Sequence, residues 1–524
     1  MSDPGSGSGS GPSSDGAGGN DAWLAVAAGT LGSLMATLDS SIVSAALPTI
    51  QGEIGASANE GTWISTAYLV AEIVMIPLAG FFDRLLGLRL FLIVCTVGFV
   101  ASSVVCGVST GLGVMILGRV GQGFFGGAMI PTALTIVSTM LSAKQRATGI
   151  ALFGFTVVVG PVAGPIVGGY LTEAYSWHYI FFINLPLGLG LLALLLIGLP
   201  AKKARLGLIA EADWLGIVGL SLCLGALTVV LEEGQRERWF ESPFIIELSA
   251  ASLVGLVLLI AGQLTAKRPV IHLGIVLQPA FGSVFVLSLS VGAALYGVSY
   301  VIPQFLDQLA DYNAFQAGQV TFIIGVPSLL LMALFPIIEK TVDIRLVIGL
   351  GLLLYGVGCL MNARITSDTS GVNFVRSLLV IGLGQYFGLV FLNSAATSAV
   401  PKELAEDASG LFNAARNLGG SFGLATITIL RENRTWFHAA RLAEGVTQNA
   451  DAAQAAGAAS GTVDVPDPGT LVEQGYAVLN QGFRTAGAAL AFADVFFVFG
   501  VLMLASMPLV FMLKPVPKEG SQPG

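Results

Sequence analysis

Long apolar stretches alternate with short polar ones along almost the whole chain. Six windows contain no Asp, Glu, Lys or Arg: 90–118, 120–143, 147–172, 269–306, 312–338 and 377–401. Each window exceeds the roughly 20 apolar residues that a helix needs to cross a bilayer. The pattern predicts an all-α polytopic membrane protein with fourteen spans, at about 22–49, 61–82, 88–108, 113–139, 147–170, 178–200, 213–232, 243–264, 279–305, 314–338, 344–362, 375–399, 405–430 and 486–513.

The composition supports a lipid environment. Charged residues make up 11% of the 524 residues and hydrophobic residues 54%, whereas an ordinary soluble domain carries about 25% charged residues. A soluble protein of this length would lack the charges to cover its surface. The 67 glycines are also in excess of the usual share of about 7%, and small residues let membrane helices approach closely.

Several classes of site and partner are not expected. All four cysteines lie in apolar spans and form no CxxC pair, and the three histidines are scattered. We therefore expect no disulfide, no metal site and no cofactor. The formal net charge of −8 argues against nucleic acid as a partner.

The basic residues predict the orientation of the spans. With the N-terminus in the cytoplasm, fourteen Lys and Arg residues fall in inner loops and eight in outer loops, and all eight lysines lie inside. Cytoplasmic loops of membrane proteins carry an excess of such residues. Both termini are therefore predicted to be cytoplasmic.

Three polar segments lie outside the predicted spans. Residues 1–21 form a Gly/Ser-rich stretch that we interpret as a disordered cytoplasmic tail, and 517–524 form a second cytoplasmic tail. The longest polar stretch, 431–485, lies on the outer side. It is interpreted as a cap or docking element, with a solvated insertion as the alternative.

Two motifs associated with enzymes occur in the wrong context. Residues 107–111 match GxSxG, but they lie in a short turn between apolar helices rather than at a strand-to-helix elbow. Residues 121–126 match GxGxxG, but no strand precedes them. No lysine follows a glycine, so the phosphate loop of ATPases is absent from the sequence. We therefore expect no enzyme, and an ion gradient as the energy source of any uphill transport.

Five charged residues lie well away from the ends of predicted spans: Asp39, Glu72, Arg119, Arg416 and Asp494. A charge near the bilayer centre costs at least about 2.5–3.5 kcal/mol on insertion scales, and such residues usually face a bundle interior or a water-filled cavity. They are candidates for proton coupling or substrate transport. The alternative for each is a structural ion pair that holds two helices together.

One predicted span is unusually rich in glycine and proline. The segment 160–169 contains Gly160, Gly164, Pro165, Gly168 and Gly169. Proline removes a backbone donor and kinks a helix, and glycine permits close packing. The cluster predicts a bendable helix at an interface that opens and closes, with a tightly packed, immobile kinked helix as the alternative.

The chain resembles the fourteen-span drug:proton antiporters of the major facilitator superfamily, of the EmrB/QacA type and closer to the EmrB branch. The first span reads LDSSIVSAALPTI at 38–50, similar to LDxTxxNxALPxI, and 119–123 match RxxQG. The run 160–169 matches the antiporter signature GxxxGPxxGG. Residues 177–186 resemble WRWxFxxNxP, and 409–420 also fit the family pattern.

The loop after the second span departs from the superfamily pattern GxLaDRxGRK. Gly80 and Gly87 align with it, but Asp83 and Arg84 stand one place early. Asp83 is therefore not carried over as the gating acid. Arg84, Gly87 and Arg89 are expected to form the positively charged cytoplasmic loop.

The resemblance implies two six-helix bundles, at 22–205 and 271–516, that rock about a central cavity, with two extra spans at 206–270. Asp39 would sense protons or cations, Arg119 would be its electrostatic partner, and 160–169 would form the flexing interface. The implied protein lies in a bacterial cytoplasmic (inner) membrane. It exports hydrophobic or amphipathic compounds in exchange for protons, with a periplasmic adaptor and an outer-membrane channel as further expected partners.

Other functions remain open at this point. A first alternative is a dedicated exporter of a metabolite or fatty acid. A second is a membrane scaffold or sensor that transports nothing, although such a protein has no need of carboxyl groups inside its spans. A membrane enzyme is more distant, because no catalytic constellation is visible.

Overall fold

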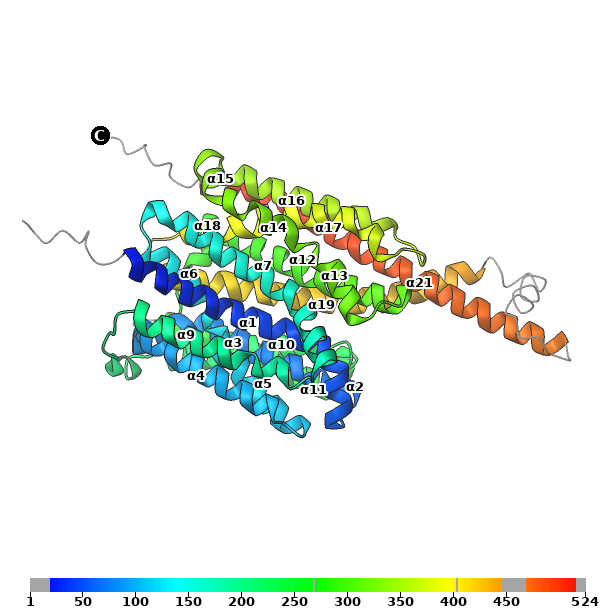
Figure 1. Cartoon of the computed structure of the whole chain (residues 1–524), viewed down its shortest axis with the longest axis horizontal. Helices are drawn as coiled ribbons and strands as arrows, with labels where there is room; N and C mark the ends of the chain where they lie inside the picture. The colour runs from blue at the N-terminus through cyan, green and yellow to red at the C-terminus, as the bar shows by residue number, and fades with distance from the viewer. Residues whose placement is uncertain (1–18, 267–268, 402–403, 445–467, 515–524) are drawn as a thin grey trace, which may run out of the picture.

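The computed structural model describes residues 19–266, 269–401, 404–444 and 468–514, and over these ranges the regular elements are all helices. Long helices run side by side along the longest axis of the molecule (Figure 1). The predicted all-α class is therefore confirmed.

The first half of the chain forms one group of helices. Helix α1 packs on α7 and α9, α3 packs on α5, and α4 packs on α5 and α9. The elements of this group are α1 (Gly19–Ile54), α2 (Ala58–Gly61), α3 (Trp63–Leu86), α4 (Leu88–Gly107), α5 (Leu112–Gly127), α6 (Met129–Met140), α7 (Ala143–Ala174), α8 (Tyr179–Phe182) and α9 (Asn184–Gly198).

The second half forms another group. Helix α12 packs on α19, α19 on α21, and α16 on both α17 and α21. The elements are α12 (Pro279–Ala310), α13 (Ala314–Phe322), α14 (Gly325–Leu331), α15 (Phe335–Thr341), α16 (Ile344–Met361), α17 (Gly371–Gln385), α18 (Phe391–Ser398), α19 (Ala405–Glu444) and α21 (Pro468–Ser506).

Two helices join these groups, α10 (Trp214–Glu233) and α11 (Pro243–Thr265). They pack on each other, and α10 also contacts α3 of the first group and α19 of the second. Short 3-10 or π turns complete the description: η1 (Leu206–Ile209), η2 (Trp239–Glu241), η3 (Leu273–Leu277), η4 (Met332–Leu334), η5 (Asn362–Arg364), η6 (Tyr386–Val390) and η8 (Met507–Met512). The residue boundaries of the two predicted bundles stay a prediction.

Within the described residues, eleven helices are long and apolar enough to cross a membrane, and two bent helix pairs bring the number to thirteen. The predicted span 405–430 lies in α19, which is not among them. Large apolar side chains point away from the core, including Leu117, Leu189, Leu264, Leu330 and Val372. A surface of this kind is stable against lipid and not against water. The chain is therefore a multi-pass membrane protein.

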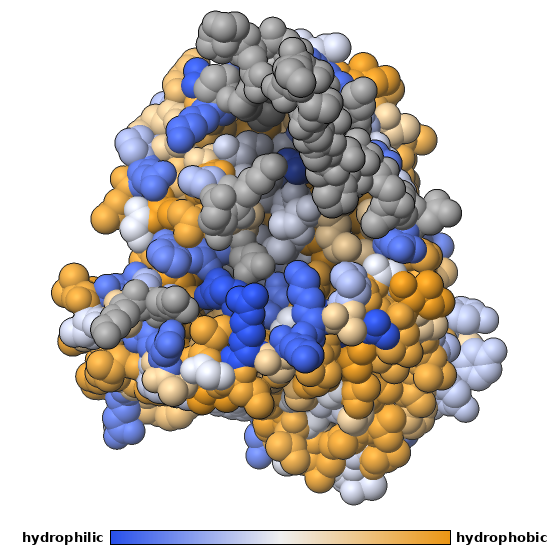
Figure 2. Space-filling view, turned by 90° about the vertical axis from the view of Figure 1, so that its left-hand side faces the viewer, coloured by the Kyte–Doolittle hydropathy of each residue, from blue (hydrophilic) through white to orange (hydrophobic). Residues whose placement is uncertain are grey.

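The two ends of the described chain lie on the same side of the molecule, since α1 begins and α21 ends at the left of Figure 1. Seen from that side, hydrophilic residues gather across the middle of the molecule and apolar residues cover its flanks (Figure 2). This arrangement fits a polar end face between lipid-facing walls. The predicted tails 1–21 and 517–524 lie almost wholly outside the described residues, except that α1 already begins at Gly19.

The structure describes both ends of the outer segment 431–485. Helix α19 continues to Glu444 and α21 begins at Pro468, so both flanks of this segment are helical. The central part, 445–467, lies outside the described residues. The two helices extend beyond the rest of the molecule (Figure 1). The extensions are polar, and for this reason the hydropathy pattern placed them outside the membrane. A polar sequence can still form a helix, so hydropathy alone did not indicate whether they are helical.

Candidate functional site

The structure brings two of the predicted charged residues together. Asp39 lies on α1 and Arg119 on α5, and the carboxylate Oδ2 lies 2.6 Å from the guanidinium Nη1. The side chains of Asp39 and Arg119 are 0% and 1% exposed, so both charges have lost their water. Such a pair is tolerable only if further hydrogen bonds satisfy its remaining polar atoms.

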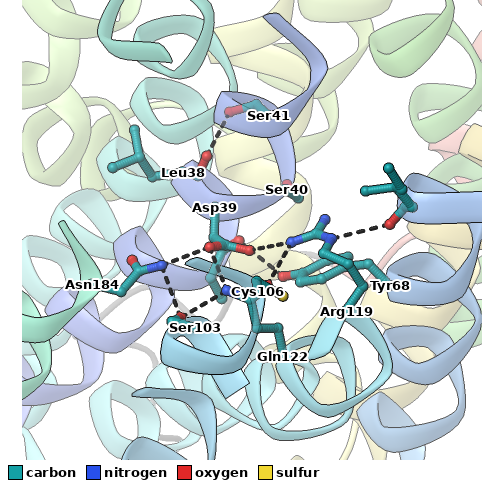
Figure 3. A network of polar contacts seen from close by, with 12 residues as sticks. Leu38, Asp39, Ser40, Ser41, Tyr68, Ser103, Cys106, Arg119, Gln122 and Asn184 are labelled. Atoms are coloured by element: carbon teal, nitrogen blue, oxygen red, sulfur yellow. Dashed lines mark hydrogen bonds and ion pairs between the residues drawn. The ribbon is translucent and has the colours of Figure 1, made fainter. Parts of the chain in front are cut away.

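Uncharged donors complete the surroundings of the carboxylate (Figure 3). Oδ1 of Asp39 accepts hydrogen bonds from Nδ2 of Asn184 at 2.6 Å and from Nε2 of Gln122 at 2.8 Å. Both amides also donate to the hydroxyl of Ser103, at 3.1 Å and 2.8 Å. Helices α1, α4, α5 and α9 thus meet at one buried polar network.

The guanidinium of Arg119 is held by three further contacts. Its Nε donates to the carbonyl oxygen of Ile64 at 3.0 Å, and its Nη1 donates to Oε1 of Gln122 at 3.0 Å. The ring of Tyr68 lies 4.3 Å from the guanidinium carbon, and the Tyr68 hydroxyl donates to the carbonyl of Ala36. Arg119 therefore contacts α3 as well as α1.

Close packing of α5 on α3 places Arg119 in this position. A Cβ at Gly123 would overlap the carbonyl oxygen of Tyr68, so only glycine fits there. Arg119 and Gly123 are four residues apart on one helix face. The glycine of the RxxQG motif thus lets its arginine reach the neighbouring helix.

Sequence reasoning found the charged pair but named none of its uncharged partners as site residues. Gln122 and Asn184 stand in the quoted segments 119–123 and 177–186, and those motifs are the signal that could have identified them. Ser103 lies on α4, outside every quoted motif. A buried serine in an apolar helix gives no hydropathy signal.

Glu72 and Arg416 form a second association of predicted residues. Glu72 lies on α3 and Arg416 on α19, and both side chains are buried. Arg416 is the strongest attractive electrostatic partner of Glu72, followed by Arg119. The hydroxyl of Tyr296, on α12, lies within electrostatic range of both Glu72 and Arg416. This second group spans the two halves of the molecule.

Asp494 lies apart from the other predicted residues. Its Oδ2 accepts a hydrogen bond from Nε of Arg434 at 2.5 Å and lies 2.7 Å from Nε2 of His438. These contacts join α21 to α19, and the Asp494 side chain is 27% exposed. The geometry favours the interpretation as an ion pair that holds two helices together.

The glycine–proline segment faces two different neighbours. A Cβ at Gly160, Gly164 or Gly168 would overlap atoms of α1, at Thr37, Ser41 and Ile42. By contrast, Pro165 and Gly169 lie at van der Waals distance from α13 of the second half, at Gly318 and Phe315. Helix α7 bends by 44° between Pro161 and Ala163. One face of α7 is therefore fixed to α1, and the other touches the opposite half.

Two of the predicted loop residues lie in helices, Arg84 in the last turn of α3 and Arg89 in the first turn of α4, and Arg84 contacts the second half. Nη1 of Arg84 lies 3.4 Å from Oδ1 of Asp407 on α19, and Nη2 donates to the carbonyl of Val270 at 3.2 Å. Nδ1 of His272 lies 2.5 Å from Oδ2 of the same aspartate. A nearby hydrogen bond, from Ser409 Oγ to the carbonyl of Pro131 at 3.1 Å, links α19 to α6.

Gly87 and Arg89 have local roles. Gly87 adopts φ +78° between α3 and α4, a conformation that side chains disfavour. Arg89 donates from Nη1 to the carbonyl of Leu199 at 3.1 Å, at the end of α9. Among the three predicted loop residues, Arg84 is the one whose contacts with the second half are described above.

A recess opens between α3 and α6 on the side of this loop. It is lined by Ile76, Ala79, Gly80 and Asp83 from α3, and by Pro131, Thr132 and Thr135 from α6. Ile76 is four residues from Glu72, which is about 6 Å along a helix. The recess therefore lies about one helical turn from Glu72, which belongs to the second buried group.

Metal-binding residues do not cluster in the described ranges: no three His, Cys, Asp or Glu side chains could hold an ion together. The four cysteines are free and buried. The chemistry that the site can perform is therefore assigned to its carboxylates, guanidinium groups and amides.

Relatives share most of the chain. It is 31% identical over 426 residues to the colistin resistance protein EmrB of Acinetobacter baumannii, covering 81% of this chain and 83% of that protein. It is 30% identical to the multidrug export protein EmrB of Escherichia coli K12, covering 93% and 94%. A crystal structure of the human organic anion transporter MFSD10 superimposes with a TM-score of 0.60 at 15% identity, covering 93% and 99%.

The matched regions contain the buried charged residues of both networks described above. The family model described as Major Facilitator Superfamily matches residues 29–424, a range that includes Asp39, Arg119 and Arg416. The arrangement of the solved neighbour independently supports the same fold. Together with the two EmrB relatives, these matches establish that the chain belongs to the major facilitator superfamily, within its EmrB-like drug antiporter family.

Proposed function

We propose that this protein is a multidrug exporter that exchanges hydrophobic or amphipathic compounds for protons by alternating access. The observation that carries the proposal is the buried pair of Asp39 and Arg119, with the hydrogen bonds that Gln122 and Asn184 donate to the carboxylate. An ionisable carboxylate inside a membrane bundle marks a proton or substrate pathway by default. The names of the two EmrB relatives support drug export as the use of that pathway.

Proton binding acts through the charge balance of the site. With Asp39 ionised, the pair with Arg119 is neutral overall. A proton on the Asp39 carboxylate leaves the Arg119 guanidinium without a compensating charge, in a place without water. An uncompensated buried charge is strongly unfavourable. Protonation therefore favours a conformation in which water or a substrate reaches Arg119, and this links proton binding to the opening of one side.

Contacts between the two halves of the molecule must also break when either side opens. Opening on the side of the α3–α4 loop requires the pair of Arg84 and Asp407 to separate. Opening on the other side requires α7 to move away from α13 near Gly169 and Phe315. The bend in α7 between Pro161 and Ala163 precedes this contact along the helix. We assign the flexing role to this helix.

The available energy is sufficient in principle. One elementary charge that crosses 100 mV gains about 2.3 kcal/mol. The chain sequence carries no phosphate loop, so coupling through the buried carboxylates is the proposed route. Asp39 would bind the coupled proton, and Glu72 would respond to it through Arg416 and Arg119, its two attractive partners.

The proposed location is a bacterial cytoplasmic membrane, with both termini in the cytoplasm. The supporting observation is the distribution of lysine and arginine between the loops. The extended ends of α19 and α21 would then project on the outer side. A periplasmic adaptor that leads to an outer-membrane channel is proposed to dock on this projection.

Transport in proteoliposomes tests the proposal. Purified protein is reconstituted, a pH gradient is imposed, and the movement of ethidium and of dodecanoate is followed. Wild type is expected to move at least one probe faster when the gradient is present. Asp39→Asn is expected to lose this dependence, because the site no longer changes its charge.

A matched control separates this effect from a general loss of charge. Asp368→Asn removes the same group from an exposed loop and is expected to transport like wild type. If Asp39→Asn keeps its response to the gradient, the proton role of Asp39 is wrong. If no probe moves, export is wrong and a scaffold or sensor gains support. Movement of only one chemical class would favour a dedicated exporter.

A further inference from the structure

The second buried group contains donors that the protein does not use. Arg416 and Asn417 are 2% and 7% exposed. Within the described parts of the chain, Nε and Nη1 of Arg416 and Nδ2 of Asn417 have no hydrogen-bond partner. Three N–H-bearing nitrogens on adjacent residues of α19 are thus buried and unpaired.

Such a cluster requires an explanation. Buried polar groups in proteins are almost always hydrogen-bonded, and an unpaired donor costs its full desolvation energy. The cost is greater for a charged group inside a membrane, where lipid offers no acceptor. Glu72 offsets part of the charge of Arg416, but a nearby charge does not satisfy the unpaired N–H groups. No acceptor among the described residues is paired with these three nitrogens, so a ligand can supply one.

The donors lie at the contact between the two halves. Gly410 of α19 packs against Ile76 and Pro77 of α3, at 3.4 Å from a Cβ built on the glycine. Arg416 lies six residues from Gly410, and Glu72 lies five residues from Pro77. Both are therefore about 8–9 Å along their helices from that contact. Their electrostatic attraction places them on the same side of it.

Tyr296 orients the amide of Asn417. Its hydroxyl donates to Oδ1 of Asn417 at 3.1 Å, so the acceptor of this amide is occupied and its Nδ2 is left free. The Tyr296 hydroxyl also interacts with the guanidinium of Arg416. A Cβ at Gly420 would overlap the Tyr296 ring, so glycine makes room for it. The donors are thus positioned in advance.

We infer that Arg416 and Asn417 recognise the anionic head group of an amphipathic substrate, above all a carboxylate. This inference rests on the proposed export function and adds the substrate class. A carboxylate offers acceptors for all three free nitrogens and neutralises the guanidinium through charge-assisted hydrogen bonds. Glu72 is the competing carboxylate from the other half. A bound anionic substrate replaces Glu72 as the partner of Arg416, and Glu72 becomes free to take up a proton.

The site discriminates between head groups by charge. An amphipathic cation would add a positive charge beside Arg416 and leave the three donors unpaired. A neutral alcohol offers one oxygen and no charge. Specificity of this kind, in which the wrong ligand leaves buried polar groups unsatisfied, is strong. The expected order of affinity at this site is anion, then neutral compound, then cation.

Binding to the whole protein in nanodiscs tests the inference without any gradient. Three probes share a twelve-carbon chain: dodecanoate, dodecanol and dodecyltrimethylammonium, each corrected with empty nanodiscs. Arg416→Gln is expected to weaken dodecanoate binding by about tenfold to a hundredfold, to leave dodecanol binding unchanged, and to leave dodecyltrimethylammonium binding unchanged or stronger, because a like charge is removed. Arg364→Gln, a loss of charge at an exposed position, is expected to bind all three like wild type.

Glu72→Gln provides an independent test if the arginine variant fails to fold. It removes the competing charge, so dodecanoate binding is expected to strengthen and dodecyltrimethylammonium binding to stay the same or weaken. Equal dodecanoate binding by wild type and Arg416→Gln would overturn the inference, as would an equal loss of all three probes or no effect of Glu72→Gln. Dodecanoate binding that depends on Arg416 but drives no gradient-dependent transport would instead contradict the proposed function and leave the inference standing.

Discussion

The two arginines inside the membrane bundle present opposite arrangements of the same group. Arg119 is paired with Asp39 at 2.6 Å, and it donates to Ile64 and Gln122 and lies beside the ring of Tyr68. Arg416 is equally buried, yet its Nε and Nη1 have no partner in the described residues. The first network lies within the first half of the chain, and the second lies between the halves.

This difference separates two roles that a buried charge can play. The charge of Arg119 is compensated by the carboxylate of Asp39, so this guanidinium responds to protonation of its partner. A guanidinium with free donors can bind a ligand directly. The protein thus separates the proton-sensitive charge from the ligand-accepting charge, and Glu72 lies within electrostatic range of both arginines.

The largest expected effect tests whether Asp39 and Arg119 form one unit. Arg119→Gln leaves the carboxylate of Asp39 buried without its counter-charge, and breaking a buried pair typically costs 3–5 kcal/mol. We expect a loss of about 3–5 kcal/mol in the free energy of unfolding, measured in mixed micelles. The double variant with Asp39→Asn should recover most of it, because no charge is then left alone. Without such recovery, the two residues do not form an energetic unit.

A second test compares the two uncharged amides. Asn184→Ala removes a donor to a buried carboxylate, and such hydrogen bonds contribute about 1.5–3 kcal/mol. Asn417→Ala removes only the hydrogen bond from Tyr296 and an amide nitrogen that is unpaired, so about 1 kcal/mol or less is expected. Thermal unfolding of both variants shows which substitution lowers the stability more. Equal losses would remove the contrast between an amide that donates to a buried carboxylate and an amide whose nitrogen is unpaired.

A third test concerns Arg416 itself. Removing an incompletely paired buried charge relieves its desolvation cost, so Arg416→Gln is expected to change the free energy of unfolding by about 1 kcal/mol or less. This is a smaller change than for Arg119→Gln, although the same atoms are removed. A loss as large as that of Arg119→Gln would mean that the protein itself satisfies Arg416.

The smallest effect is expected at Asp494. Its pair with Arg434 is partly exposed, and such pairs contribute up to about 1 kcal/mol. Asp494→Asn should therefore lower stability only slightly and keep gradient-dependent transport. The measurement is the proteoliposome assay beside thermal unfolding. If Asp494→Asn abolished transport but kept normal stability, Asp494 would belong to the proton pathway.

The sequence led to the charged residues of the site because charges are rare in apolar runs. Their depth followed from the spans. The pairing of Asp39 with Arg119 was implied by the family resemblance and not by hydropathy, which carries no information on which helices meet. Asp494 shows the same limit, since a carboxylate in a span can face a helix partner rather than the centre. Gln122 and Asn184 have no charge, so they were visible only through motifs.

The fold was predicted well where hydropathy is the physical signal and less well elsewhere. The apolar spans correspond to helices, because lipid leaves the backbone no alternative. The polar segment 431–485 was expected to lie outside the spans, but the pattern did not show how far α19 and α21 continue into it. Helices that pair in water are stabilised by each other, here by contacts between α19 and α21. That stabilisation is tertiary and leaves no trace in a hydropathy pattern.

Helix α19 also constrains how the protein is made. It is the long helix of the second half that lacks enough apolar character to count as a span on its own, and it carries Arg416 and Asp407 in buried positions. A charge at the centre of a spanning helix, such as Arg416, costs about 2.5–3.5 kcal/mol when the helix enters the membrane alone. The contacts of α19 with α12, α21 and α3 provide the protein surroundings that this charge needs. We therefore expect α19 to complete its insertion together with these helices rather than alone.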